Sequence, residues 1–266
     1  MTAASPTILV FDSGLGGLTV YREIVKLRPD ARFVYAADDK AFPYGRLSEA
    51  ELTARVVAVM AALIETHRPD LIVIACNTAS TLVLVALREQ FDVPFVGTVP
   101  AIKPACAASQ TRMVSVLGTE ATVAREYTKA LIRDFGQGCE ITLIGSRRLA
   151  VLAEALLHGE EVDDDDIAEE IMPCFLEKDG ARTDTIVLAC THYPLLLERL
   201  NRLAPWPVTW LDPAPAIAKR VVALIGGQPD GASKGVAAFT LTSGRQPSQE
   251  LAAGLMPFGF GKSHQV

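Results

Sequence analysis

The stretches IVIACNTAST (Ile72–Thr81) and IVLACTHYPL (Ile186–Leu195) share one pattern: an uncharged apolar run ends in Ala-Cys and continues with small polar residues. A short run of Ile, Val and Leu is typical of a strand buried on both faces, as in a parallel sheet covered by helices. A helical pattern follows each run. The repeat therefore predicts two parallel sheets, each with a cysteine at the end of one strand.

Strand and helix patterns alternate along almost the whole chain, which predicts α/β units with parallel sheets. TVYRE (Thr19–Glu23) and TVARE (Thr122–Glu126) each follow a strand and a glycine-bearing turn, so two features recur in the same order in both halves. We therefore expect two similar, pseudo-symmetric α/β domains with an active site in the cleft between them. Strands are expected at 7–12, 32–39, 70–76, 93–99, 112–119, 140–146, 186–190 and 207–212, and helices at 18–29, 48–67, 81–91, 122–135, 149–159 and 194–204.

The composition excludes several classes of function. With 266 residues, half of them hydrophobic, and a formal charge of -6, the chain fits a globular protein without the basic clusters that nucleic acids require. Its longest apolar run, Val56–Ile64, is far short of the roughly 20 residues that span a bilayer. The first residues lack the basic region of a signal peptide. We expect a cytoplasmic protein that binds neither nucleic acid nor membrane, with the acidic run 159–170 as a solvated loop and helix start.

The cysteines stand at positions 76, 106, 139, 174 and 190 without a C-x-x-C pair, so we expect free thiols. Cys76 and Cys190 differ from the others because each ends a strand where a helix is expected. Ligands of open parallel sheets bind at the carboxyl ends of strands, where Asp12, Thr119 and Asp212 also fall. A helix dipole would lower the pKa of both thiols from the usual value of about 8.5. The alternative is that each cysteine is a small apolar plug.

Two thiols at equivalent positions suggest a chemical reason for the duplication. If the strand ends of the two units face each other, the cleft carries one thiol on each wall, and a flat intermediate can be reached from both faces. One thiolate then removes a proton from a carbon acid, and the opposite thiol returns a proton to the other side. The pattern predicts stereoinversion by two thiols. Because the lysines lie in no motif that indicates a Schiff-base site, we expect no cofactor.

Neighbouring residues allow further interpretations. His192 could take or shuttle a proton near neutral pH, or serve as a cap or packing group. The glycine-rich turn FDSGLGGL (Phe11–Leu18) offers backbone N–H groups for a carboxylate, but it lacks the third glycine of a dinucleotide loop. Cys76, Cys190 and His192 could also ligate a metal, although the paired local spacing of zinc sites is missing from the sequence, so we expect no metal.

Five motifs together resemble the glutamate racemase family, cofactor-independent enzymes of the wider aspartate/glutamate racemase group. They are FDSGLGGLTV, FPYG, ACNTAS, GTEATV and ACTHYPLL, and the match runs from about Ile8 to Gly244. The resemblance implies that Cys76 and Cys190 are the catalytic acid/bases, with Asp12, His192 and Glu154 as further catalytic residues. Asp12 would assist the first thiol and His192 the second. The resemblance also implies a set of residues that hold glutamate: Asp12, Ser13, Pro43, Tyr44, Gly45, Asn77, Thr78, Thr119, Thr122, Thr191 and His192.

The resemblance also implies an organisation and a biological role. The second domain (98–209) would be inserted into the first (1–97 plus 210–266), and the protein would form a homodimer that supplies D-glutamate for peptidoglycan. Two alternatives stay open. One is a racemase of aspartate or a hydantoin; the other is a thiol redox or ligand-binding protein without turnover, in which Cys76 and Cys190 form a reversible disulfide. The stretch after Gly244 matches no motif, and we assign it no role.

Overall fold

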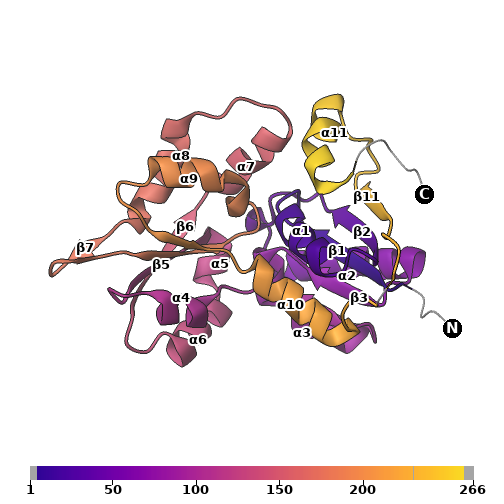
Figure 1. The fold of residues 1–266 in the computed structure, drawn as a ribbon, viewed down its shortest axis with the longest axis horizontal. Helices are drawn as coiled ribbons and strands as arrows, with labels where there is room; N and C mark the ends of the chain where they lie inside the picture. The colour runs from indigo at the N-terminus through magenta and orange to yellow at the C-terminus, as the bar shows by residue number, and fades with distance from the viewer. Residues whose placement is uncertain (1–4, 230, 261–266) are drawn as a thin grey trace.

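Two parallel sheets with helices on both faces organise the chain. The computed structural model describes residues 5–229 and 231–260, and its two sheets lie in separate lobes (Figure 1). This arrangement confirms the predicted α/β fold. Within the described ranges, no helix is long and apolar enough to cross a bilayer.

The first sheet has the strand order β11-β2-β1-β3-β4, and all neighbouring strands are parallel. Its strands are β1 (Thr7–Asp12), β2 (Arg32–Ala37), β3 (Leu71–Ile74), β4 (Phe95–Gly97) and β11 (Ala237–Leu241). Its helices are α1 (Leu18–Leu27), α2 (Glu49–His67), α3 (Asn77–Gln90), α10 (Ala214–Ile225) and α11 (Gln249–Leu255), with the 3-10 turns η1 (Tyr44–Arg46) and η4 (Met256–Phe258).

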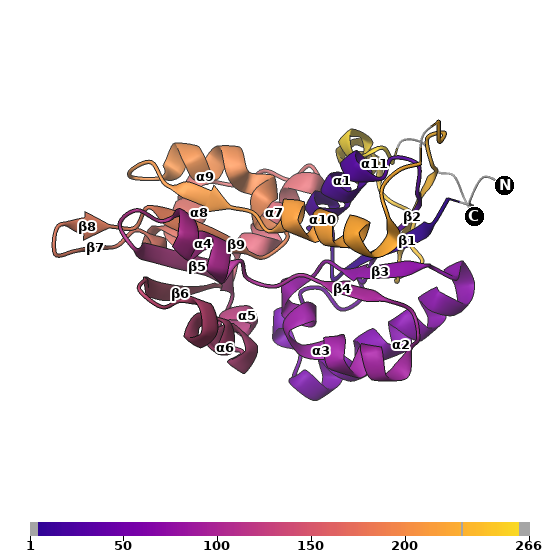
Figure 2. The same cartoon turned by 60° about the horizontal axis from the view of Figure 1, so that its bottom comes forward.

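The side chains of β1 alternate between two cores, as the period of a strand requires. Ile8 and Val10 pack in the core that contains α1 and α10, whereas Leu9 and Phe11 pack in the core that contains α2 and α3. Figure 2 shows these helix pairs on opposite sides of the sheet. Because both faces are covered, the strand reads as an unbroken apolar run.

The second sheet has the order β10-β9-β5-β6, again entirely parallel. Its strands are β5 (Met113–Thr119), β6 (Glu140–Ser146), β9 (Thr185–Ala189) and β10 (Thr209–Leu211). Its helices are α4 (Ile102–Ala108), α5 (Glu120–Ala124), α6 (Glu126–Phe135), α7 (Leu149–Leu157), α8 (Asp164–Ile171) and α9 (Leu197–Leu203), with the 3-10 turns η2 (Met172–Cys174) and η3 (Tyr193–Leu196). A separate antiparallel hairpin joins β7 (Glu177–Lys178) and β8 (Ala181–Arg182).

The strand orders of the two sheets reveal the duplication. When β1, β2, β3 and β4 are matched in turn with β5, β6, β9 and β10, the two sheets have the same order. The matched central strands end at Asp12 and Thr119, and the matched third strands lead into Cys76 and Cys190. Carboxyl ends of parallel strands meet at one edge of a sheet, so each unit presents the same kind of edge.

Several local expectations need correction. The helix expected at 122–135 is divided into α5 and α6 because Arg125 is extended there (φ -61°, ψ 138°), and its guanidinium pairs with Glu49 of α2. The helix expected at 81–91 begins at Asn77, and the one expected at 194–204 begins as the 3-10 turn η3. Helices α4, α10 and α11 and strand β11 were not expected.

The domain boundaries near residues 97 and 210 stay a prediction. Strand β10 of the second sheet spans Thr209–Leu211, and α10 then packs in the core of the first sheet. The stretch after Gly244 contributes α11 and η4, while residues 261–266 lie outside the described residues.

Candidate active site

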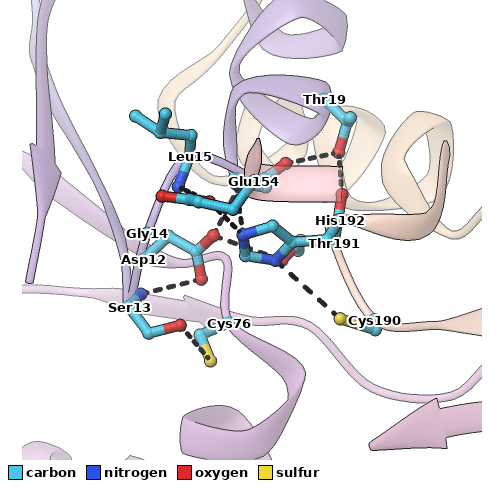
Figure 3. Close-up of polar contacts among 12 residues, drawn as sticks. Asp12, Ser13, Gly14, Leu15, Thr19, Cys76, Glu154, Cys190, Thr191 and His192 are labelled. Carbon is cyan, nitrogen blue, oxygen red and sulfur yellow. Dashed lines mark hydrogen bonds and ion pairs between the residues drawn. The ribbon is translucent and has the colours of Figure 1, made fainter. Parts of the chain in front are cut away.

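The candidate site lies where strand ends of the two sheets meet, and it contains both repeated cysteines (Figure 3). Cys76 is the N-cap residue of α3, and Cys190 directly follows β9. Both side chains are buried, with 5% and 6% of their surface exposed. Together with Cys106, Cys139 and Cys174 they are free thiols, as expected.

Asp12 is fully buried at the end of β1, and its carboxylate is held by three donors. The backbone N–H groups of Ser13 and Gly17 donate to it at 2.9 and 2.6 Å, and the Thr191 hydroxyl donates to it at 3.2 Å. Burial raises the pKa of Asp12 above its ordinary value, although the nearby His192 acts in the opposite direction. A carboxyl group with a raised pKa is suited to hold or pass a proton.

Cys76 has surroundings that favour the protonated thiol. Burial raises its pKa well above the ordinary value, and the neighbouring Asp12 raises it further. The contact of its Sγ with the Ser13 hydroxyl, at 3.5 Å, acts in the opposite direction but is outweighed. The expectation that the helix dipole lowers the pKa of Cys76 is therefore wrong, because desolvation outweighs the hydrogen bonds from the Ser13 hydroxyl and the Ala79 N–H.

Cys190 faces His192 instead of a carboxylate. Its Sγ lies 3.9 Å from Nδ1 of the imidazole, and Nε2 on the other side of the ring lies 2.5 Å from the Glu154 carboxylate. Burial alone would lower the pKa of His192, but the contacts with Cys190 and Glu154 outweigh it and raise that pKa well above 6.5. The helix expected after Cys190 begins as the 3-10 turn η3, and the imidazole of His192, with its raised pKa, supplies a positive charge beside the thiol.

The proton on Nε2 follows from the contacts of that atom. The Gly16 N–H points at Nε2 from 3.2 Å, and Glu154 is closer at 2.5 Å. A single nitrogen cannot accept from Gly16 and donate to Glu154 at once, and we assign the proton to the shorter, charge-assisted contact. Glu154 thereby fixes the orientation of the ring, and it leaves Nδ1 to exchange a proton with Cys190.

The glycine-rich turn after β1 binds the protein's own carboxylates. Its N–H groups at Ser13 and Gly17 bind Asp12, and that of Leu15 donates to Glu154 at 2.9 Å. These donors are thus occupied, which differs from the expectation that the turn offers them to a ligand. A Cβ at Gly16 would lie 2.3 Å from Nδ1 of His192, so only glycine lets the turn approach the imidazole.

Three threonine hydroxyls join the two sheets beside the thiols. Thr78 of α3 lies 3.0 Å from Thr119 and 3.2 Å from Thr122, and the latter two lie 2.9 Å apart. Next to them, both polar side-chain atoms of Asn77 are buried without a hydrogen-bond partner in the described part of the chain. A buried amide without partners is costly, so this position is suited to a polar ligand.

Three of the remaining expected residues form hydrogen bonds with other residues. Thr191 contacts Asp12, as described, whereas Asp212 accepts from the N–H of Ala214, the first residue of α10, at 2.9 Å. Tyr44 is buried and donates to Asp38 at 2.7 Å. Pro43 follows a cis peptide bond, and Gly45 is exposed with open space around it.

Sequence reasoning missed two residues that contact the site. The ring of Phe42 lies 5.4 Å from the His192 ring, and the Thr19 hydroxyl donates to the Thr191 carbonyl at 3.1 Å. Both belong to motifs that were recognised, FPYG and FDSGLGGLTV, so their position in these motifs was the available signal. Among the described residues, no group of three or more His, Cys, Asp or Glu side chains is arranged to hold a metal ion.

The fold and the paired thiols agree with the comparisons to known proteins. The Asp/Glu/Hydantoin racemase family matches residues 8–221, a range that includes both cysteines, and the chain belongs to this family. It is 56% identical to the glutamate racemase of Brucella anthropi over 223 residues, which cover 84% of this chain and 80% of that protein. It is 50% identical to the glutamate racemase of Mesorhizobium japonicum over 261 residues, or 96% and 97% of the two chains.

A solved structure shows the same fold. Glutamate racemase from Escherichia coli, in complex with L-glutamate and the activator UDP-MurNAc-Ala, superimposes with a TM-score of 0.87 at 44% identity. The comparison covers 96% of both chains, so it includes both sheets and the strand ends that carry Cys76 and Cys190.

Proposed function

We propose that the protein is a glutamate racemase, which interconverts L-glutamate and D-glutamate with Cys76 and Cys190 as acid and base. One observation carries the proposal: the two thiols follow equivalent strands of duplicated sheets, and each has a titratable group nearby, since the charge of Asp12 acts on Cys76 and His192 contacts Cys190. Close relatives and a solved structure with bound L-glutamate support this substrate.

In the proposed reaction, no atom is gained or lost by the substrate. A thiolate at Cys190 takes the α-proton, and the electron pair of the broken C–H bond is delocalised into the adjacent carboxylate. The thiol of Cys76 then donates its proton to the opposite face of the flat intermediate. The enzyme is left with a thiolate at Cys76 and a thiol at Cys190, and the other enantiomer reacts through the same steps in reverse.

The surroundings of the thiols suit these two states. A protonated imidazole at 3.9 Å stabilises a negative sulfur at Cys190, and the pKa of His192 is raised by Cys190 and Glu154 against the effect of burial. The raised pKa of Cys76 keeps that thiol protonated and ready to act as the acid. The resting enzyme would therefore hold Cys190 as the base.

The substrate would be held by groups that have unused or exchangeable hydrogen bonds. In the described chain, the side-chain amide of Asn77 forms no hydrogen bond. The hydroxyls of Thr78, Thr119 and Thr122 there bond only one another or the adjacent backbone. A glutamate carboxylate would replace the weak hydroxyl contacts by charge-assisted bonds. Ser13, Thr191 and the Pro43–Gly45 segment would complete the site.

The decisive experiment replaces each thiol by a hydroxyl and follows hydrogen exchange. Cys76→Ser and Cys190→Ser should each lower the racemisation rate by at least about 100-fold, because a hydroxyl is a far weaker acid than a thiol. The half-exposed Cys139→Ser serves as the matched control and should keep its activity. In deuterated water, early turnover of the unmodified enzyme should label the product enantiomer well before the recovered substrate.

The same assay separates the alternatives. Faster inversion of aspartate or a hydantoin than of glutamate would change the substrate but keep the mechanism. Equal early labelling of both enantiomers would exclude two separate bases. No racemisation of any of these compounds by the reduced protein, together with a Cys76–Cys190 disulfide on mild oxidation, would favour a redox or binding function.

The cellular role follows from the proposed reaction. A glutamate racemase would act in the cytoplasm as a homodimer and supply D-glutamate for peptidoglycan. A strain that lacks the gene should then need D-glutamate for growth, and light scattering of the purified protein would determine its oligomeric state.

A further inference from the structure

Helix α11 connects the core of the first sheet with α7 of the second. Its residues Leu251 and Leu255, both 2% exposed, lie in the core that contains α1 and α10. Leu157, the last residue of α7, packs against the same core. Figure 1 shows α11 beside α7, with β11 on its other side. The stretch after Gly244, which matched no motif, therefore contacts both halves of the molecule.

Gly254 lies where α11 approaches the end of α7 closely. A Cβ at Gly254 would lie 2.6 Å from the carbonyl oxygen of Leu157. This distance is shorter than real Cβ contacts, and the atom it would meet belongs to the backbone, so α7 or α11 would have to move. One turn further, a Cβ at Gly159 would lie 3.3 Å from Cβ of Glu250.

The end of α7 is close to the proton partners of Cys190. Glu154 lies three residues before Leu157 in the same helix, and its carboxylate contacts Nε2 of His192 at 2.5 Å and the Leu15 N–H at 2.9 Å. The start of α7 is held by Ser146, whose Oγ accepts from the Leu149 N–H at 3.1 Å. A shift of α7 at Leu157 would therefore displace the Glu154 side chain as well.

A cavity lies between α7 and α11, so the packing of Gly254 against Leu157 matters more for the position of α7. It has a volume of about 340 Å³, and its lining includes Glu154 and His158 on one side and Ser248 and Leu251 on the other. Near Glu154 the two helices are thus separated by open space. The contact of Gly254 with Leu157 is the close packing that holds α7 against α11 beyond this gap.

We propose that Gly254 is a positioning residue for the racemase: its lack of a side chain lets α11 hold α7 where Glu154 can fix the imidazole of His192. This inference rests on the proposed function. Glu154 itself acts through His192, because it orients the ring whose Nδ1 faces Cys190. Gly254 would then help to prepare Cys190 for proton transfer.

The test combines Gly254→Ala with Glu154→Gln in a double-mutant cycle. Gly254→Ala should lower kcat for glutamate racemisation by about tenfold with a smaller change in KM, since misplacement of groups by about 1 Å can cost up to 100-fold. Glu154→Gln should lower kcat by a similar or larger factor. In the Glu154→Gln background, Gly254→Ala should then cause less than a twofold further loss, because the contact through which it acts is already absent.

The pH profile gives a second readout that a merely structural role would not change. The Glu154 contact raises the pKa of His192, so both single variants should move the alkaline limb of kcat/KM to lower pH. The exposed Ala253→Ser in the same helix should leave activity and the profile unchanged. If Gly254→Ala does not fold, Leu251→Val is the second variant, because it removes only one methylene from the packing of α11 against the core. Combined with Glu154→Gln, it should also cause less than a twofold further loss of kcat.

Three outcomes would overturn the inference. They are full activity of folded Gly254→Ala, losses that multiply in the double variant, or an unchanged alkaline limb. Failure of the proposed function is a different result, because the unmodified protein would then not racemise glutamate at all.

Discussion

At the scale of single residues, Cys76 and Cys190 have equivalent positions but unequal partners. Asp12 and burial raise the pKa of Cys76, while Cys190 faces an imidazole whose own pKa is raised. The duplication thus produced two thiols at equivalent positions whose surroundings differ in charge. If Cys190 is the resting base and Cys76 the acid, as we propose, this asymmetry prepares the enzyme for one direction of the reaction before substrate binds.

Alkylation by iodoacetamide should reveal the asymmetry, because only the thiolate reacts. The two thiols are 5% and 6% exposed, so accessibility does not distinguish them. At pH 7, Cys190 should be modified several times faster than Cys76. A raised pKa keeps Cys76 protonated at neutral pH, so its rate should rise only above the ordinary thiol value of about 8.5. Peptide mapping by mass spectrometry measures both rates.

The control for this prediction removes the positive partner. His192→Asn should slow modification of Cys190 and leave that of Cys76 nearly unchanged. Faster labelling of Cys76 at pH 7 in the unmodified protein would contradict the assignment of the resting base.

The sequence was sufficient to locate the thiols but not to predict their ionisation. Cys76 and Cys190 could be found because strand ends are readable from apolar runs, and parallel strands bring such ends together. The balance between a helix dipole and burial depends on how completely the cleft is covered, which no local pattern reports. The contact of Glu154 with His192 joins α7 to the turn after β9, and only the folded chain brings them together.

At the scale of elements, Asp38 joins four segments of the first sheet. Its fully buried carboxylate, just beyond β2, accepts from Arg55 of α2 at 2.9 Å and from Tyr44 of η1 at 2.7 Å. The hydroxyl of Thr242, just after β11, donates to the same group. Burial would raise the pKa of Asp38, but the bonds from Arg55, Thr242 and Tyr44 together lower it. The FPYG segment is therefore held in place by one ionised carboxylate.

Arg55→Met should destabilise the fold at pH 7 by about 2 kcal/mol, because it leaves Asp38 as a buried charge without its cation. This loss of stability is smaller than the roughly 3–5 kcal/mol that follows when one partner of a fully buried ion pair is removed, because a third of the Arg55 side chain is exposed. A lowered pKa gives stability that is present at neutral pH and lost as pH falls through that pKa. The difference between the two proteins, measured by urea unfolding, should therefore shrink as pH falls below about 4.

The exposed Arg46→Met is the matched control for this prediction, because Arg46 has no ion pair among the described residues. Its stability should stay within about 0.5 kcal/mol of the unmodified protein. An equal loss in both variants, or a difference for Arg55→Met that grows in acid, would refute the role of the Asp38 pair.

Elements with a clear period were predictable, and those defined by tertiary contacts were not. Strand β6 was predicted with its observed bounds, 140–146, and the glycines at 136 and 138 mark a turn before it. The division between α5 and α6 depends on Arg125, whose partner Glu49 is distant in the sequence. Strand β11 is only partly buried, and it becomes a strand by pairing with β2, which its own sequence does not indicate.

At the scale of the whole molecule, the two sheets contact each other through groups that also belong to the candidate site. Thr78 from the first sheet's α3 bonds Thr119 and Thr122 from the second, and Glu49 of α2 pairs with Arg125 beside them. Neutral hydroxyl bonds contribute only about 1 kcal/mol each. A charged ligand that bonds all three hydroxyls would therefore join the two halves more strongly than the hydroxyls do by bonding one another.

Thr78→Val tests this coupling, because it keeps the shape of the side chain and removes only the hydroxyl. KM for glutamate should rise about tenfold, since a bond to a charged group contributes roughly 1.5–3 kcal/mol and part of it replaces an existing bond to Thr119. The rise in Tm caused by saturating glutamate should shrink as well, because stabilisation by a ligand follows its affinity. In the control Thr81→Val, the lost hydroxyl bonds only the carbonyls of its own helix, so KM should change less than twofold. Equal effects of both substitutions on KM would mean that the hydroxyls merely stabilise α3. If glutamate raised the Tm of Thr78→Val as much as that of the unmodified protein, it would not join the two sheets through Thr78.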